Sequence, residues 1–126
     1  MNVISAPGAP AAVGPYSHAL DTGSLVFCSG QVALDAQTGE LTGDDVAAQT
    51  RKVFSNIEAV LGAAGLELGH VVKATVFLET MDDFAAMNAV YEAAFGEHKP
   101  ARSTVAVAGL PVGARVEIEV IAARPA

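Results

Sequence analysis

Arg102 stands out among the residues that could bind or transform a ligand. It lies near the start of ARSTVAVA, a run of small and β-branched residues that predicts a strand over 101–108. The chain has only 7 Lys and Arg against 14 Asp and Glu, so a guanidinium at the mouth of an apolar strand is a scarce group. A guanidinium can bind a carboxylate through two parallel hydrogen bonds. Arg102 is therefore either a solvated residue at a strand end or the anion-binding group of a site.

An acidic partner is predicted on a second strand, over 115–123. If these two strands pair as a hairpin about the loop GLPVG, Thr104 lies across from Glu119, with Arg102 one step along on the same face. The helices should cover the all-apolar faces, which on the two strands are made of Ser103, Val105 and Val107, and of Val116, Ile118 and Val120. Arg102 and Glu119 would then meet on the open face. One interpretation is an exposed ion pair that adds little stability. The other is a functional pair, in which Arg102 binds a substrate carboxylate and Glu119 acts on a water molecule as a base.

The other reactive residue types give weaker signals. Cys28 lies in an apolar strand without a basic neighbour, which favours a core residue over a nucleophile. As the single cysteine, it can form no internal disulfide and supplies no zinc cluster. The three histidines, His18, His70 and His98, are expected to be structural or solvated. The residue types therefore predict no metal site.

The elements that must position these residues can be read from periodicity. The first fifteen residues, rich in Ala, Pro and Gly, predict an irregular arm, and two strands should follow around the turn DTG. Helices are expected over 45–64, capped by Asp44 or Asp45, and over 83–96, with a strand over 71–78 between them. The order β-β-α-β-α-β-β predicts an α+β fold, a two-layer sandwich of one mixed sheet with two helices on one face.

Length and charge restrict the class of protein. The 126 residues suffice for one domain, spanning 1–126, and 52% of them are hydrophobic, which suggests apolar surface buried between copies of the chain. The net charge of −7 and the lack of a basic patch disfavour nucleic acid as a partner. No apolar run reaches the ~18 residues of a membrane span. The start of the chain lacks the pattern of a secretory signal, so a cytoplasmic location is expected.

Five segments together give the chain a family resemblance. They are GPYSHA, CSGQVALDAQTGEL, AAQTRKVFSNIEAVLGAAGL, DDFAAMNAVYEAAF and PARSTVAVAGLPVGARVEIEV. In this order they cover essentially the whole chain, which resembles the YjgF/RidA family. The resemblance implies a chorismate-mutase-like fold and a homotrimer with clefts between subunits. It also implies hydrolysis of reactive 2-imino (enamine) acids, such as 2-iminobutanoate and 2-iminopropanoate, to 2-oxo acids and ammonia, without a cofactor or metal.

The resemblance also assigns roles to single residues. It implies that Arg102 binds the substrate carboxylate, that Glu119 holds and activates the attacking water, and that Tyr16 orients substrate or water. The remaining substrate-binding residues implied by it are Ser29, Gly30, Asn88 and Thr104. The chain departs from the family pattern in having Thr104 where relatives carry cysteine, and Lys99 where an aromatic residue is common. The alternatives are a small-carboxylate-binding or chaperone-like trimer without catalysis and, ranked lower, an endoribonuclease that inhibits translation.

Overall fold

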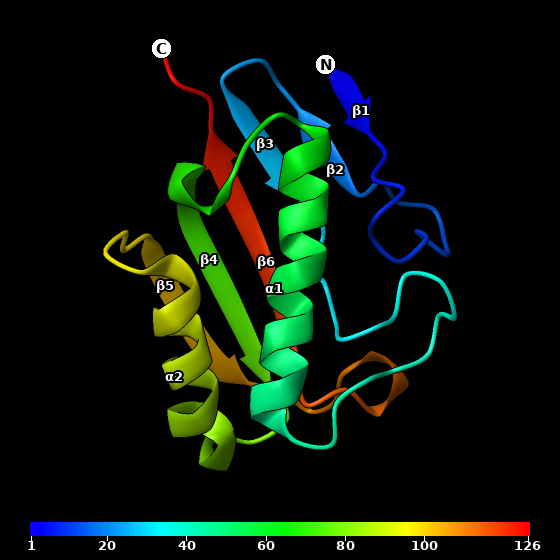
Figure 1. Cartoon of the computed structure of the whole chain (residues 1–126), viewed down its shortest axis with the longest axis vertical. Helices are drawn as coiled ribbons and strands as arrows, with labels where there is room; N and C mark the ends of the chain where they lie inside the picture. The colour runs from blue at the N-terminus through cyan, green and yellow to red at the C-terminus, as the bar shows by residue number, and fades with distance from the viewer.

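A six-stranded mixed sheet carries two α-helices on one of its faces (Figure 1). The computed structural model describes all 126 residues. Three single-turn 3-10 helices, Leu68–His70, Met81–Asp83 and Pro111–Gly113, lie in the connections. The α+β sandwich predicted from the sequence is confirmed. Its main elements are β1 (Asn2–Ile4), β2 (Ala19–Asp21), β3 (Leu25–Cys28), α1 (Val46–Ala63), β4 (Val71–Leu78), α2 (Phe84–Phe95), β5 (Ala101–Ala106) and β6 (Val116–Ala123).

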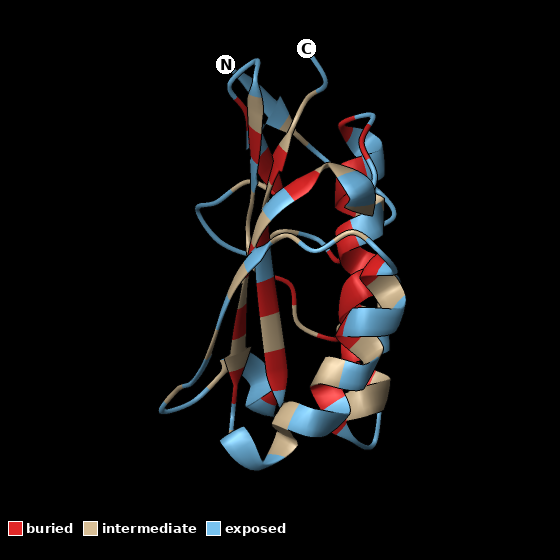
Figure 2. Ribbon diagram, turned by 90° about the vertical axis from the view of Figure 1, so that its left-hand side faces the viewer, coloured by how far each residue is buried: buried red, intermediate tan, exposed pale blue.

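The core lies between the sheet and the helices, as the band of buried residues in Figure 2 shows. The apolar stripe of α1 faces the sheet and is buried, with Val53, Ile57 and Leu61 at most 1% exposed. Asp45 caps this helix, because its side chain accepts a hydrogen bond from the amide of Ala48 at 2.8 Å. Gly65, at a φ of +75°, takes the left-handed conformation that ends a helix. Local sequence therefore sets where α1 begins, ends and faces.

The strand order is β1-β2-β3-β6-β4-β5, and it differs from the prediction in two places. The N-terminal arm contains a short strand, β1, which pairs antiparallel with β2. β1 has only three residues, which are too few to show the alternation of a strand, and it is followed by a segment rich in Ala, Pro and Gly. The predicted hairpin of the last two strands is wrong, because β6 inserts between β3 and β4 while β5 pairs parallel with β4. The segment β4–α2–β5 is thus a parallel crossover unit, which places β5 at the edge of the sheet.

The faces of β6 and β5 follow from the register. In β6, Ile118 and its apolar neighbours at alternate positions are buried under the helices, as predicted. In β5, however, Arg102 is the partner of Ala74 and Thr104 is the partner of Val76, and these two β4 residues are buried. Since residues paired across a sheet share a face, Arg102 and Thr104 point toward the helical layer. The expectation that they lie on the open face is therefore wrong, because an edge strand can place polar residues on the helical face.

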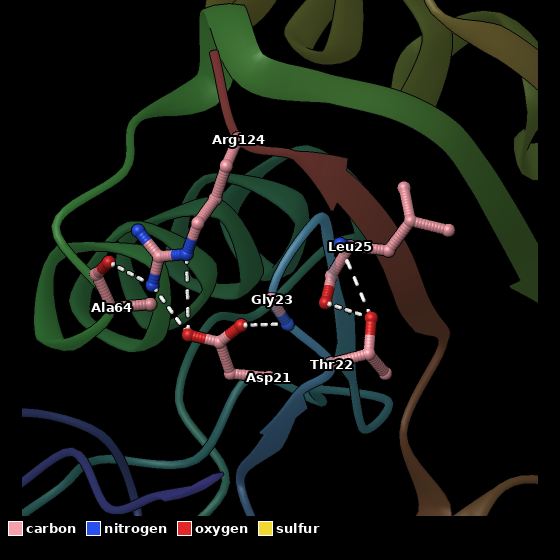
Figure 3. Close-up of polar contacts among 6 residues, drawn as sticks. All are labelled: Asp21, Thr22, Gly23, Leu25, Ala64 and Arg124. Atoms are coloured by element: carbon pink, nitrogen blue, oxygen red, sulfur yellow. Dashed lines mark hydrogen bonds and ion pairs between the residues drawn. The ribbon is translucent and has the colours of Figure 1, made fainter. Parts of the chain in front are cut away.

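A polar clip ties the end of the chain to β2 and to the end of α1 (Figure 3). The guanidinium of Arg124 donates to Asp21 Oδ2 at 2.6 Å through Nη2, and the same nitrogen donates to the carbonyl of Ala64 at 2.8 Å. The other oxygen of Asp21 accepts from the amide of Gly23, at the turn between β2 and β3. The clip therefore joins β2, the end of α1 and the end of β6.

The open face of the sheet keeps apolar side chains in contact with solvent. Phe27 of β3 and Val105 of β5 are each 44% exposed. An apolar surface of this kind is typical of proteins that pack against a partner. Neither helix has the length and apolar character that a membrane span requires.

Candidate functional site

Arg102 lies at the seam between β5 and α2, where α2 supplies all of its side-chain partners. Its Nη1 donates to Asn88 Oδ1 at 2.7 Å, and its Cζ lies 4.6 Å from the ring centroid of Tyr91 and 5.6 Å from that of Phe84. The three partners are spaced i, i+4 and i+7 along one face of the helix. No carboxylate pairs with Arg102, since the one ion pair of the structure joins Arg124 to Asp21. The guanidinium is held in place without being neutralised.

A pocket of about 350 Å³ opens beside this guanidinium. Asn88 and Arg102, both predicted from the sequence, are brought together in its wall, and Lys99 is an exposed residue of the rim. The full lining is Asn88, Tyr91, Glu92, Gly96, Lys99 and Arg102. Phe84 and Tyr91 were not among the site residues predicted from the sequence, although both contact Arg102. Their spacing from Asn88 was the one available signal.

Buried polar atoms without partners belong to the two elements that form this seam or directly precede one of them. Three buried side-chain atoms have no hydrogen-bond partner, and they are Asp83 Oδ2, the Tyr91 hydroxyl and Thr104 Oγ1. All three belong to β5, to α2 or to the residue that precedes α2. Burial raises the pKa of Tyr91, and the nearby charge of Arg102 opposes that rise, so the phenol is neutral at physiological pH. Buried polar atoms without partners are uncommon, and their concentration here separates this seam from the rest of the core.

A second group of predicted residues lies on the open face. Glu117 is packed against Gly30, where an added Cβ would collide with its carboxylate. Desolvation raises the pKa of Glu117, and repulsion from Glu119 adds to the effect. Glu119 is itself exposed, opposite Thr75. The structure therefore favours Glu117 over the predicted Glu119 as the carboxylate with a specialised environment. The sequence could not separate them, because both have the same parity on β6.

Tyr16 and Ser29 line a hollow of about 400 Å³ beside β2 and β3. Tyr16 is 52% exposed, and the hydroxyl of Ser29 donates to the carbonyl of Ser17 at 2.6 Å. Cys28 lies in the same wall, where burial raises its pKa to about 11, so the sulfur is a neutral thiol. The buried His18 is structural as expected, because the amide of Ala6 donates to its Nδ1 and its Nε2 contacts a backbone carbonyl at 2.7 Å. No group of three or more His, Cys, Asp or Glu side chains is arranged to hold a metal ion.

Within one chain, the predicted site residues and Glu117 thus form two separate groups. Arg102, Asn88 and Thr104 lie on the helical side of the β5 edge, whereas Tyr16, Ser29, Gly30 and Glu117 belong to the region of β2, β3 and the open face. Strands β6 and β4 separate β3 from β5. The predicted meeting of Arg102 with Glu119 on one face does not occur within a chain, because the two side chains point to opposite sides of the sheet.

Comparison with known proteins places these features in a family. A family model described as endoribonuclease L-PSP matches residues 6–124. A 2-iminobutanoate/2-iminopropanoate deaminase from Salmonella typhimurium is 49% identical over 124 residues, covering 96% of both chains. The crystal structure of the yjgF gene product of Escherichia coli is similar with a TM-score of 0.94 at 47% identity, covering 99% of this chain and 100% of that one. That of E. coli TdcF with bound serine has a TM-score of 0.94 at 44% identity and the same coverage.

Proposed function

The chain belongs to the endoribonuclease L-PSP family, also known as YjgF/RidA, and from this premise we propose that it hydrolyses short 2-imino acids. The products are a 2-oxo acid and ammonia, and 2-iminobutanoate and 2-iminopropanoate are the proposed substrates. Relatives of 48–49% identity carry the name of this activity, and a relative of known structure binds serine, a small carboxylate. The observation that carries the proposal is the guanidinium of Arg102, fixed in a pocket without a carboxylate partner.

The chemistry demands little of the protein, because a protonated imine carbon is already electrophilic. Arg102 would hold the carboxylate in a bidentate pair. A water molecule about 3 Å from C2 would attack it while a carboxylate accepts the water's proton. The proton then passes from the carboxylate to the nitrogen of the resulting carbinolamine. The C–N bond breaks as the hydroxyl group loses its proton and becomes the C=O group, and the nitrogen leaves as ammonia, which takes up that proton. One water is consumed for each ammonia released. Glu117 suits the base role, since desolvation raises its pKa and a more basic carboxylate accepts a proton more readily.

The two groups of site residues lie apart within one chain, which supports a site completed by a second copy of the chain. Each group is then one half of the site, or half-site. In this proposal, the Arg102 half-site of one subunit faces the half-site with Tyr16, Ser29, Gly30 and Glu117 of another. The free outer edge of β5 and the apolar open face supply surface for such contacts. A homotrimer with three clefts between subunits is the assembly we propose.

The description of the family model as an endoribonuclease favours a second candidate function. Cleavage of RNA requires contacts to phosphates, usually from several Lys and Arg residues. Only Lys99 accompanies Arg102 around the pocket, which also contains Glu92, and the chain carries a net charge of −7. We therefore rank this function below deamination. A trimer that binds small carboxylates without turning them over is a third candidate function, and the assay described below distinguishes it from a deaminase.

A coupled assay tests the proposal directly. An amino-acid oxidase generates 2-iminopropanoate from alanine, and pyruvate release is followed with and without the protein. We expect faster release with the wild type and a loss of about 100-fold in kcat/KM for Arg102→Ala, because the carboxylate is no longer positioned. Arg51→Ala is the matched control, since Arg51 is an exposed arginine of α1 outside the pocket. An unchanged rate with the wild type would contradict deamination, and RNA cleavage lost with Arg102→Ala would establish the nuclease instead.

A further inference from the structure

The guanidinium of Arg102 stacks on an aromatic ring that has no assigned role. Its Cζ lies 4.6 Å from the ring centroid of Tyr91, closer than the 5.6 Å to Phe84. The face of an aromatic ring attracts a cation without neutralising its charge. A carboxylate in the place of Tyr91 would instead form an ion pair and compete with an incoming anion. The ring therefore stabilises Arg102 and leaves its charge available.

Tyr91 is itself rigidly supported from both helices. It is 8% exposed, and its ring packs at a steep angle of 72° against Phe54 of α1, with the centroids 5.7 Å apart. Its ring centroid also lies 4.8 Å from that of Phe95, and the centroids of Phe95 and Phe54 are 5.5 Å apart. Three rings in mutual contact restrict one another's rotation. The surface on which Arg102 rests is therefore part of the hydrophobic core.

The hydroxyl of Tyr91 does not explain the position of this ring. It is buried and forms no hydrogen bond, so the ring is held by packing alone. Arg102 in turn makes one side-chain hydrogen bond, from Nη1 to Asn88 Oδ1. A guanidinium has five N–H donors in a planar fork, so most of them remain unused. A guanidinium held over the ring of Tyr91 and by Asn88 at one nitrogen leaves its other donors for a ligand in the adjacent pocket.

We propose that Tyr91 is a positioning residue for Arg102, and that its ring sets the orientation of the guanidinium that receives the substrate carboxylate. This inference rests on the proposed function for the identity of the ligand. It assigns the effect to the aromatic face and not to the hydroxyl. Loss of the ring should weaken carboxylate binding and raise KM, whereas kcat should change little, because the groups that act on water lie elsewhere.

The test measures pyruvate affinity by calorimetry, together with kcat and KM for 2-iminopropanoate and the melting temperature. For Tyr91→Leu we expect pyruvate affinity about 10-fold weaker and KM raised to match. Tyr91→Phe keeps the ring and should bind pyruvate within about 2-fold of the wild type. It should also be at least as stable, since it removes an unpaired hydroxyl. Val53→Ala, a fully buried change in α1 outside the pocket, is the control for lost core packing.

A second variant keeps the shape of the ring while changing its electrostatics. Tyr91→pentafluorophenylalanine reverses the charge distribution of the ring face, and we expect it to bind pyruvate as weakly as Tyr91→Leu. Wild-type pyruvate affinity in Tyr91→Leu or in Tyr91→pentafluorophenylalanine would overturn the inference. So would a loss of pyruvate affinity in Val53→Ala equal to that in Tyr91→Leu. Pyruvate binding without imine turnover would overturn the proposed function alone. Absence of pyruvate binding by the wild type would overturn this inference together with the role of Arg102.

Discussion

Two arginines of the chain, Arg124 just after the inner strand β6 and Arg102 on the edge strand β5, have opposite surroundings. Arg124, near β2 and the end of α1, gives its donors to the carboxylate of Asp21 and the carbonyl of Ala64 (Figure 3). Arg102, at the edge strand β5, meets two aromatic rings and the amide of Asn88. The first charge is neutralised within the chain, and the second is positioned and left free.

This difference separates a structural charge from one that is available for binding. Around Asp21, hydrogen bonds from Arg124 and from the amide of Gly23 lower the pKa of the carboxyl group, so the ion pair is favoured at neutral pH. Around Arg102, the neighbouring Tyr91 and Thr104 carry buried hydroxyl oxygens without partners. A fold that satisfies its polar groups around Arg124 and leaves them unsatisfied around Arg102 concentrates its binding capacity around Arg102.

The largest effect expected beyond Arg102 itself comes from the half-buried Glu117, a carboxylate that is likewise unpaired. Glu117→Gln should lower kcat by about 100-fold, because it removes a general base while keeping the shape of the side chain. It should not lower stability at neutral pH, since the raised pKa of Glu117 means that its ionised form is disfavoured in the folded state. Steady-state kinetics and thermal unfolding measure both quantities.

Glu119 provides the matched comparison for that experiment. Because Glu119 is exposed, Glu119→Gln should lower kcat by less than about 10-fold. A larger loss in Glu119→Gln than in Glu117→Gln would contradict the assignment of Glu117 and would support the residue predicted from the sequence.

Arg124→Ala should produce the reverse pattern, with reduced stability and retained chemistry. The change leaves the buried Asp21 without its counter-charge and Ala64 without a donor, so the melting temperature should fall. Because none of the residues of the clip lines the pocket beside Arg102, kcat/KM below the melting transition should stay within about 2-fold of the wild type. Thermal unfolding and the imine assay on the same samples would show this. Wild-type stability in Arg124→Ala would deny the clip its structural role.

The smallest expected effect is the dependence of the clip on acid. The folded-state pKa of Asp21 lies below its ordinary value of 3.8, so the ionised carboxylate adds stability above that value. This contribution is lost as the pH falls from 3.8 through the lower folded-state pKa. The difference in melting temperature between the wild type and Asp21→Asn should therefore be constant near neutral pH and shrink in strong acid. A difference in melting temperature that is the same in strong acid as at neutral pH would contradict the role of ionisation of Asp21.

Much of the fold could be predicted because it depends on local pattern. The span of α1 and the alternation of β6 around Ile118 were predicted correctly, and of the two caps proposed for α1, Asp44 and Asp45, the structure has Asp45. The family motifs also selected Asn88, an amide on a helix that no composition argument would single out, and the structure places it 2.7 Å from Arg102. Each of these features depends on residues close together in the sequence, so it can be detected without knowing which segments of the chain pack together.

Strand neighbours and burial had to come from the tertiary structure. The sequence set the parity of Arg102 and of the two glutamates, but a strand has two faces, and which one the helices cover depends on the partner strand. Pairing of β5 with β4 turned Arg102 toward α2, and the approach of Gly30 desolvated Glu117 while Glu119 stayed in solvent. Amino-acid order thus determined the helices, the turns and the alternation. Contacts between distant segments decided which charges face the core, because desolvation depends on packing from elsewhere in the chain.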